Sequence, residues 1–336
     1  MTKTVAIIGG GVAGLETAKQ LNSLGYSVKL FEKMNTLGGH VAKWDRLFPN
    51  KRHASEVVSS LTLSQGNTQT ITETTVHSIK RENQGFVISA NSSNHEADAV
   101  VLATGFELFP AEKKEEYGYG LFENVITSAD LEQMFKKHGK PVMASGHKPV
   151  RIAFIHCVGS RDEKVNRPYC SKVCCVTAVK QAIEVKEALP NSEVFCFYMD
   201  LRMFGPGYED LYKEAQSKGV TFIRGRLSES SEIEGGRVLI KAEDTLASTP
   251  LKMSVDIVVL MVGMSPLRDT NKLATDLGLS INADGFIAAT DLHTNPTGTA
   301  TNGVFVAGAC TGPNNITDTV NAAKATALDV HNYLSR

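Results

Sequence analysis

The chain has 336 residues, of which 21% are charged and 42% hydrophobic, a composition typical of folded globular proteins and long enough for about two domains. Its 35 Lys and Arg nearly balance 36 Asp and Glu, which excludes a strongly basic nucleic-acid binder and a charge-driven membrane binder. The longest apolar run, residues 257–262, is far shorter than the roughly 18 residues of a membrane helix. Because no signal-peptide layout precedes the first motif, the sequence predicts a cytoplasmic protein.

The first third of the chain alternates between strand and helix patterns. The apolar run 5–8 enters a glycine-rich turn, a helical pattern follows at Leu15, Ala18 and Leu21, and residues 27–32 form the next strand. A strand, a glycine turn, a helix and a strand predict a βαβ unit in a parallel sheet. Further strands are predicted at 75–80, 86–90 and 99–102, and a helix at 128–137. The charged stretch 112–116 is predicted to be a solvated surface.

A second βαβ pattern follows a stretch rich in Gly, Pro and short polar residues, 138–149, which reads as a linker. It consists of a strand at 151–155, a helix at 173–188 and a strand at 193–199. The apolar segment 257–263, a strand at 303–308 and a helix at about 317–335 complete the pattern. The elements predict an α/β fold with two domains.

The first glycine turn has the spacing of a dinucleotide-binding motif. Gly9 permits the tight turn, Gly11 lets the backbone approach a pyrophosphate, and Gly14 lets the helix pack closely on the sheet. The helix N-terminus favours phosphate charge, and Glu32 at the end of the next strand is placed to accept ribose hydroxyls. Three later segments favour FAD over NAD as the dinucleotide: Leu37-Gly38-Gly39-His40, Val101-Leu102-Ala103-Thr104-Gly105, and the returning strand Gly303–Gly308.

This pattern resembles the flavoprotein disulfide reductase family, in its thioredoxin reductase-like branch. The resemblance implies a fold of two dinucleotide-binding domains, with an FAD-binding domain at 1–140 and 264–336 interrupted by an inserted NAD(P)-domain-like module at 150–263. It implies the following FAD contacts: Gly9, Gly11, Ala13, Gly14, Glu32, Lys33, Gly39, His40, Val41, Val76, Ala103, Thr104, Gly105, Gly308, Ala309, Ile316 and Thr317. Where related flavoproteins have Gly-Asp, this chain has Gly308-Ala309, so a side-chain contact is lost there.

Two features of that family are missing. The sequence has no Cys-x-x-Cys motif, which a disulfide reductase needs beside its flavin. The turn after the strand 151–155, residues 156–162, keeps only one glycine, so the second nucleotide-binding turn is degenerate. Four cysteines occur there instead: Cys157, Cys170, Cys174 and Cys175. Four thiolates suit a [4Fe–4S] cluster, while a structural zinc ion and redox-active thiols, including a Cys174–Cys175 disulfide, are the alternatives.

Longer motifs resemble the HdrA family, the flavin-containing component of heterodisulfide reductase. They are His156-Cys-Val-Gly-Ser-Arg-Asp, Pro168-Tyr169-Cys170-Ser-Lys-Val-Cys174-Cys175, Tyr117-Gly-Tyr-Gly with Asn124-Val-Ile-Thr-Ser128, Tyr198-Met-Asp-Leu-Arg202 with Phe204-Gly, and Gly308-Ala-Cys-Thr-Gly-Pro-Asn314. The resemblance implies that the four cysteines ligate a [4Fe–4S] cluster near FAD. Because ferredoxin-type cysteine runs are absent from the sequence, it is most similar to the short HdrA-like protein of sulfur-oxidising bacteria.

That resemblance implies an oxidoreductase subunit that passes electrons between flavin and cluster in a sulfur-oxidising complex. The implied partners are a second copy of the chain, subunits similar to heterodisulfide reductase B and C (HdrB- and HdrC-like), and a lipoate-binding protein that carries sulfur. The alternative functions are a stand-alone NAD(P)H-dependent flavoprotein disulfide reductase using Cys174 and Cys175, and a zinc-stabilised flavoprotein scaffold.

Three single residues each have two possible interpretations, one functional and one structural, and a fourth has only a structural one. Lys180 is either a solvated helix lysine or a residue whose ammonium tunes the flavin potential. His40 either contacts FAD or is structural, and Cys310 either approaches the flavin or is a small buried thiol, whereas Cys196 is predicted to lie in the core. The C-terminal helix, beginning near Ile316, is predicted to direct its positive end at the flavin.

Overall fold

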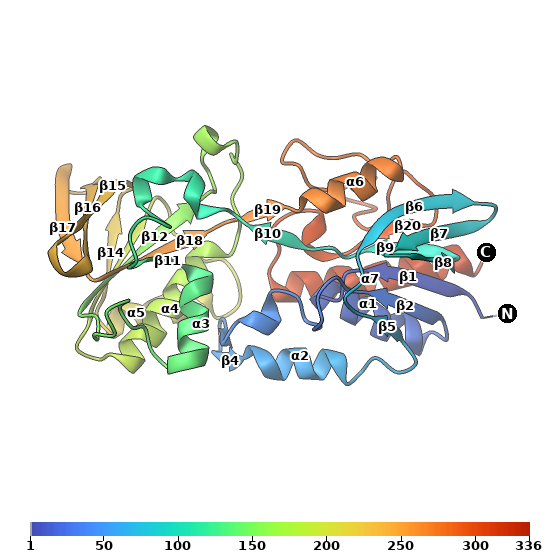
Figure 1. The fold of residues 1–336 in the computed structure, drawn as a ribbon, viewed down its shortest axis with the longest axis horizontal. Helices are drawn as coiled ribbons and strands as arrows, with labels where there is room; N and C mark the ends of the chain where they lie inside the picture. Colours follow the sequence, from blue (N-terminus) through green and yellow to red (C-terminus); the bar gives the residue numbers. More distant parts are fainter. Residues whose placement is uncertain (1) are drawn as a thin grey trace. The chain divides into compact units, whose positions relative to one another are not determined.

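The computed structural model describes residues 2–336, which divide into two compact units. The first unit comprises residues 1–42, 55–107 and 265–336, and the second comprises residues 43–54 and 108–264. The short strands β10 (Phe106–Leu108) and β19 (Met264–Pro266) carry the chain from one unit to the other (Figure 1). Each unit is built on its own five-stranded sheet.

The first unit has a parallel sheet in the order β20-β9-β1-β2-β5. Its strands are β1 (Thr4–Ile8), β2 (Ser27–Phe31), β5 (Gln69–Ile71), β9 (Ala99–Leu102) and β20 (Val304–Val306). The strands β1 and β9 are apolar and buried, as expected of central strands covered on both faces. Helices α1 (Val12–Ser23) and α7 (Ile316–Leu334) pack against each other, although nearly 300 residues separate them. The first unit is therefore formed from segments near both ends of the described chain.

Further elements complete the first unit. A three-stranded antiparallel sheet contains β6 (Val76–Glu82), β7 (Gly85–Ala90) and β8 (Ser93–Ala97). Helix α2 (Ala54–Thr62) begins at the boundary between the units, and helix α6 (Arg268–Asp276) lies against β6. The core of this unit joins the central strands to the small sheet through Ala6, Val100, Ile79 and Ile88, all fully buried.

The second unit repeats the parallel arrangement in the order β11-β18-β12-β13-β14. Its strands are β11 (Val125–Thr127), β12 (Arg151–Val158), β13 (Glu193–Tyr198), β14 (Val220–Arg224) and β18 (Ile257–Val262), and its helices are α3 (Ser128–His138), α4 (Cys174–Ala188) and α5 (Tyr208–Ser217). An antiparallel sheet of β15 (Leu227–Ile233), β16 (Arg237–Asp244) and β17 (Thr249–Val255) and a small hairpin of β3 (Arg46–Leu47) and β4 (Arg52–His53) complete it.

The boundary between the units lies earlier in the chain than the sequence predicts. The predicted boundary is near residue 140, at the Gly- and Pro-rich stretch, but the chain enters the second unit at residue 108. The reason is that β11 pairs with β18 in the second sheet, so β11 and the helix α3 that follows it belong to the inserted unit. Composition reveals the irregular stretch but does not reveal which sheet a three-residue strand joins.

Candidate functional site

The glycine turn after β1 is shaped by close backbone contacts. Gly9 has a φ of +111°, and a Cβ there would lie 2.4 Å from the carbonyl oxygen of Ala103. A Cβ on Gly14 would lie 1.9 Å from the carbonyl oxygen of Gly9, so only glycine lets α1 begin this close to the turn. A Cβ on Gly11 would have no neighbour closer than 4.0 Å, which leaves open space above the start of the helix. The turn therefore has the tight packing and the free cradle that a pyrophosphate requires.

The carboxylate of Glu32 is fixed at the end of β2. It is 7% exposed, and it accepts hydrogen bonds from the backbone N–H groups of Gly10 and Met34, both at 2.8 Å. Each oxygen retains a further lone pair for a ribose hydroxyl. Helix α1 has no acidic residue in its first turn, so its positive end is not neutralised by the chain itself. The site therefore fits a dinucleotide with its phosphates at the helix start.

Three distant segments converge on this turn, as the sequence predicts. Gly38 donates its N–H to the carbonyl of Gly10 at 2.8 Å, and a Cβ on Gly39 would lie 3.2 Å from Gly11 Cα. Ala103 borders Gly9, and a Cβ on Gly308 would lie 2.7 Å from the Cβ of Ala13. The structure thus places Gly39, Ala103, Gly308 and the neighbouring residues around one cradle.

The other predicted cofactor residues lie in the first unit as well. Thr104 is hydrogen-bonded to Thr270 at 2.7 Å, and Gly105 follows with a φ of +74°. His40 stacks on Phe106 at 4.5 Å between ring centroids, with Nε2 3.0 Å from the Phe106 carbonyl, which accounts for the ring in structural terms. Val41 and Ala309 are buried, Val76 and Ile316 are half-buried, and Lys33 and Thr317 are exposed. Contact of these residues with FAD stays a prediction.

The corresponding turn of the second unit, between β12 and α4, is replaced by a longer loop. Fifteen residues, 159–173, separate β12 from α4, where a nucleotide-binding turn would pass directly into the helix. The ring of the buried Phe109 packs directly on Gly159, the single glycine of this turn, because a Cβ there would lie 2.0 Å from the ring. The hydroxyls of Ser160 and Ser171 meet at 2.5 Å and close the loop on itself. The loop therefore lacks an open glycine cradle like the one over Gly11.

Three of the four predicted cluster ligands come together at this turn. Cys157 is near the end of β12, and Cys174 and Cys175 form the first turn of α4, where the helix dipole favours thiolates. Cys174 hydrogen-bonds to both neighbours, and this lowers the pKa of Cys157 and of Cys175 while the pKa of Cys174 is raised. The fourth, Cys170, is half-buried on the loop and accepts a hydrogen bond from the Lys172 N–H at 3.4 Å.

Buried polar groups surround these thiols. His156 is 6% exposed, neither ring nitrogen has a hydrogen-bond partner of ordinary geometry, and the ring contributes to the lowered pKa of Cys175. The Nη1 group of Arg161 is also buried without a hydrogen bond of ordinary geometry, and the guanidinium contributes to the lowered pKa of Cys157. Buried donors of this kind fit an anionic group at the thiols, such as a thiolate-bound iron–sulfur cluster.

Within residues 2–336, no three His, Cys, Asp or Glu side chains are placed to hold a single metal ion. A single zinc ion requires its ligands to converge on one point, whereas a [4Fe–4S] cluster separates its four sulfur ligands by the width of the cube. Four free cysteines are a donor set that a [4Fe–4S] cluster or a structural zinc ion can use, and the choice between them stays a prediction.

A buried ion cluster anchors the cysteine-bearing loop. The Asp162 side chain is 2% exposed and pairs with Lys114 at 2.9 Å and with Arg226. Although burial opposes the shift, these two cations lower the pKa of Asp162. Lys114 also pairs with Glu116 at 2.6 Å. The prediction that residues 112–116 form a solvated surface is therefore wrong for Lys114, whose side chain is 4% exposed.

Lys180 is buried rather than solvated, so the surface interpretation of this residue is wrong. Its side chain is 2% exposed, and its ammonium lies 2.5 Å from Glu132 Oε1 and 3.1 Å from Glu184 Oε2. Glu132 also accepts from Gln181 at 2.6 Å and from the Asp45 N–H at 3.0 Å. The network joins α3, α4 and the segment before β3 within the second unit. Tuning of the flavin by Lys180 stays a prediction.

Replacing Glu184 by glutamine is expected to remove a pH dependence of stability. Burial raises the pKa of Glu184 from its usual 4.5 to about 7 against the opposing effect of Lys180. Because the folded carboxyl holds its proton more tightly, stability falls as pH rises from about 4.5 to about 7, by a total of roughly 3 kcal/mol. Urea unfolding of Glu184→Gln at pH 5 and pH 8 should show this slope reduced. Glu193→Gln, at an exposed carboxylate paired with Arg151, is the control, and an unchanged slope in Glu184→Gln contradicts the assignment.

The two remaining cysteines are buried thiols. Cys310 is 2% exposed and donates to the Leu102 carbonyl at 3.2 Å, and burial raises its pKa to about 12. Cys196 is fully buried in β13, and burial raises its pKa as well. Both are in the core, as the simpler interpretation of each predicts.

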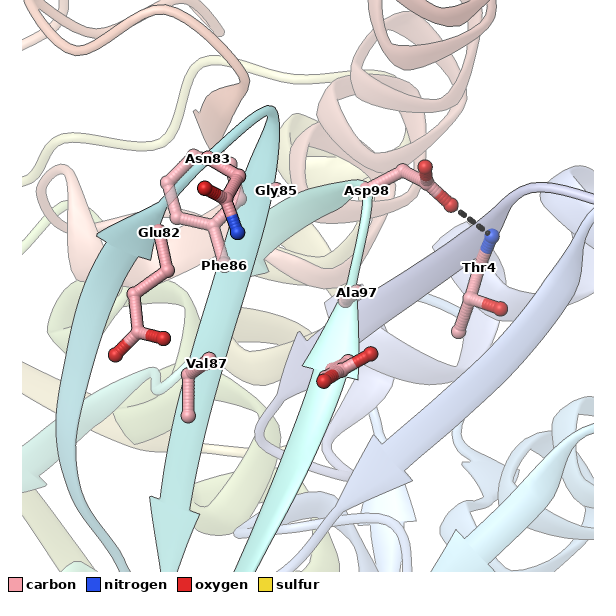
Figure 2. Close-up of a pocket in the computed structure, with 9 residues that line it drawn as sticks. Thr4, Glu82, Asn83, Gly85, Phe86, Val87, Ala97 and Asp98 are labelled. Atoms are coloured by element: carbon pink, nitrogen blue, oxygen red, sulfur yellow. Dashed lines mark hydrogen bonds between the residues drawn. The ribbon is translucent and has the colours of Figure 1, made fainter.

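A pocket of about 310 Å³ lies at the edge of the small antiparallel sheet of the first unit (Figure 2). Asp98 lines it and accepts a hydrogen bond from the Thr4 N–H at 2.7 Å. Its lining consists of Thr4, Glu82, Asn83, Gly85, Phe86, Val87, Glu96, Ala97 and Asp98. None of the predicted cofactor or cluster residues is among them.

Comparison with known proteins identifies the fold. Residues 3–152 match the model of the pyridine nucleotide-disulphide oxidoreductase family. The thioredoxin reductase of T. acidophilum has the same fold, with a TM-score of 0.71 and 20% identity over 99% of this chain and 100% of that chain. The thioredoxin reductase of Lactococcus lactis also has it, with a TM-score of 0.70 and 16% identity over 99% of each chain. The predicted thioredoxin reductase-like fold is thus confirmed. No helix of residues 2–336 has the length and apolar character needed to cross a membrane.

The sequence relatives are HdrA proteins, components of heterodisulfide reductases. The iron-sulfur HdrA protein of the CoB–CoM heterodisulfide reductase of Methanocaldococcus jannaschii is 31% identical over 422 aligned positions, covering 98% of this chain and 64% of that protein. The HdrA protein of the H2:CoB–CoM heterodisulfide,ferredoxin reductase of Methanothermobacter thermautotrophicus is 42% identical over 240, covering 69% of this chain and 36% of that protein. The chain thus spans about one to two thirds of these relatives' lengths. The chain is thus similar to HdrA proteins over nearly its whole length, as its long motifs predict.

Proposed function

We propose that this chain is an electron-transfer subunit of a heterodisulfide reductase-like complex, with FAD in its first unit and a [4Fe–4S] cluster in its second. The observation that carries the proposal is the second turn, where a cysteine-bearing loop and buried polar groups facing its thiols stand in place of a phosphate-binding turn. Support also comes from the relatives, one of which is named as an iron-sulfur protein. FAD exchanges two electrons and the cluster one at a time, so together they convert between the two kinds of transfer.

The first unit supplies the FAD-binding residues in this proposal. The N–H groups at the start of α1 bind the pyrophosphate over Gly11, and Glu32 binds the ribose hydroxyls. Gly39 and Gly308 border the cradle without filling it. Cys157, Cys170, Cys174 and Cys175 are the proposed cluster ligands, and the thiolate form is favoured at Cys157 and Cys175, whose pKa values are lowered.

The finer proposal is a complex that oxidises sulfur. It rests on the resemblance of the motifs to the short HdrA-like proteins of sulfur-oxidising bacteria. On this proposal the chain forms a homodimer, assembles with HdrB- and HdrC-like subunits in the cytoplasm, and receives electrons from sulfur carried on a lipoate-binding protein. The partner subunits perform the sulfur chemistry, since the chain itself has no Cys-x-x-Cys motif.

Oxygen-free purification tests the cofactor content. We expect one FAD and four iron and four sulfide ions per chain, with zinc absent. Cys174→Ser should lose the iron and sulfide but keep the FAD, because Cys174 lies in the second unit. Cys196→Ser, which changes a buried thiol of the same unit that the proposal does not use, is the matched control. Protein that holds FAD but neither iron nor sulfide would contradict the proposal, and stoichiometric zinc would favour the scaffold interpretation.

The alternative is an NAD(P)H-dependent disulfide reductase that uses Cys174 and Cys175. The lowered pKa of Cys175 beside the raised pKa of Cys174 is the observation in its favour, since such a pair resembles an attacking thiolate and its neighbour. The second turn, which lacks an open glycine cradle, counts against it. Anaerobic addition of NADPH separates the two functions: rapid bleaching of the flavin supports the reductase, and an unchanged spectrum supports the electron-transfer function.

A further inference from the structure

Arg161 is held in an unusual conformation beside the cysteines. It lies three residues after β12, has a φ of +55°, and donates its backbone N–H to the Tyr169 carbonyl at 2.8 Å. Its Nη2 group donates to Asp200 Oδ2 at 2.7 Å, which fixes the direction of the guanidinium. A left-handed conformation at a non-glycine residue costs free energy and is common at functional sites. The chain therefore maintains this arginine in place at some cost.

The other end of the guanidinium faces the thiols, where it interacts with the sulfur of Cys157. Nη1 is buried and makes no hydrogen bond of ordinary geometry. Although burial opposes it, interaction with Asp200, Cys157 and Cys170 raises the pKa of Arg161. Arg161 thus interacts electrostatically with both Cys157 in β12 and Cys170 on the loop.

A buried guanidinium N–H without a hydrogen bond of ordinary geometry is unfavourable, because the group has lost its water and a cysteine thiol is only a weak acceptor. Arginine cannot avoid the cost by losing its proton. A negatively charged group seated among the thiols would satisfy Nη1, and the sulfur atoms of a thiolate-bound cluster accept such hydrogen bonds.

We propose that Arg161 is a positioning residue that donates a hydrogen bond to the iron–sulfur cluster and raises its reduction potential. This inference rests on the function proposed above. Reduction adds negative charge to the cluster, so a fixed cation at its sulfur atoms stabilises the reduced form more than the oxidised form. Asp200 holds the guanidinium in place, and a cluster bound by Cys157 would present stronger sulfur acceptors to Nη1 than the thiol does.

The test compares cluster potentials by anaerobic electron paramagnetic resonance titration of the full chain. In Arg161→Gln we expect unchanged iron and sulfide content and a reduction equilibrium shifted at least tenfold toward the oxidised form, which is about 59 mV for a one-electron couple. Arg161→Lys should shift it less, because the charge stays but the fixed fork is lost. Arg224→Gln is the matched control, because it removes the same positive charge from a half-exposed arginine that lies 3.7 Å from the same Asp200 carboxylate.

Each outcome decides the inference. A potential unchanged in Arg161→Gln overturns it, and so does an equal shift in Arg224→Gln, which would reveal only a general effect of charge. If Arg161→Gln cannot hold the cluster, Arg161→Lys decides by its potential, and loss of the cluster from both variants would overturn the tuning role in favour of a purely structural one. Absence of iron and sulfide from the unaltered protein would instead overturn the proposed function, so the two failures are distinguishable.

Discussion

Gly14→Ala is expected to destabilise the protein by about 3 kcal/mol or more and to abolish FAD binding. The new Cβ would lie 1.9 Å from the Gly9 carbonyl oxygen, and neither the turn nor α1 can move away without losing its packing on the sheet. The measurements are urea unfolding of the flavin-free protein and titration with FAD. The clash is between backbone atoms and the new methyl group, so a flexible side chain cannot relieve it.

Gly11→Ala is the matched variant in the same turn. Its Cβ would meet nothing closer than 4.0 Å, and its φ of −77° suits any residue, so the flavin-free protein should keep its stability to within about 1 kcal/mol. The methyl group would instead occupy the proposed pyrophosphate space and weaken FAD binding at least tenfold. Normal FAD affinity in Gly11→Ala would show that the phosphates do not lie over this residue.

Lys180→Met is expected to destabilise the protein by about 3–5 kcal/mol at pH 8. The change removes the ammonium that lies between Glu132 and Glu184, whose side chains are each 4% exposed, and leaves two buried carboxylates without their cation. Because Glu184 can take up a proton at lower pH, the loss should be smaller at pH 5 than at pH 8. Unfolding in urea at the two pH values measures both effects.

Two further variants define the origin of that loss. Lys186→Met removes a lysine of the same helix whose ammonium bonds only to backbone carbonyls of Pro190 and Ser192, and it should cost less than about 1 kcal/mol. Adding Glu184→Gln to Lys180→Met should restore part of the stability. In the folded double variant, a lowered flavin potential would support the predicted tuning role of Lys180, while an unchanged potential would rule it out.

The glycine turn after β1 was predictable because its requirements are local. Gly9, Gly11 and Gly14 occur within six residues, and the strand and helix around them follow from a short apolar pattern. The grouping of three thiols was predictable for the same reason, since they bracket one turn. The convergence of Gly39, Ala103 and Gly308 on the first turn was predicted from motifs typical of flavoproteins, because nothing in the spacing alone brings segments so far apart together.

The predictions that the structure contradicts concern residues whose contacts are distant in sequence. Lys180 looks like a surface lysine until Glu132, 48 residues earlier, is placed beside it by the packing of α3 on the second sheet. Lys114 is misjudged in the same manner, since Asp162 and Arg226 come from other elements. The strand β11 is only three residues long, and its pairing with β18 cannot be seen in its composition. Charge pairs and edge strands of this kind are fixed by tertiary structure.

The first sheet acquires its edge strand β20 and the covering helix α7 only from residues 304–334. During synthesis, the inserted unit is already complete at residue 264, while the other unit still lacks the strand beside β9 and the helix packed on α1. On the ribosome the inserted unit is therefore free to fold first. On the proposed function, the FAD site is complete only after translation of this region has finished, and we expect a nascent chain halted before β20 to carry no flavin.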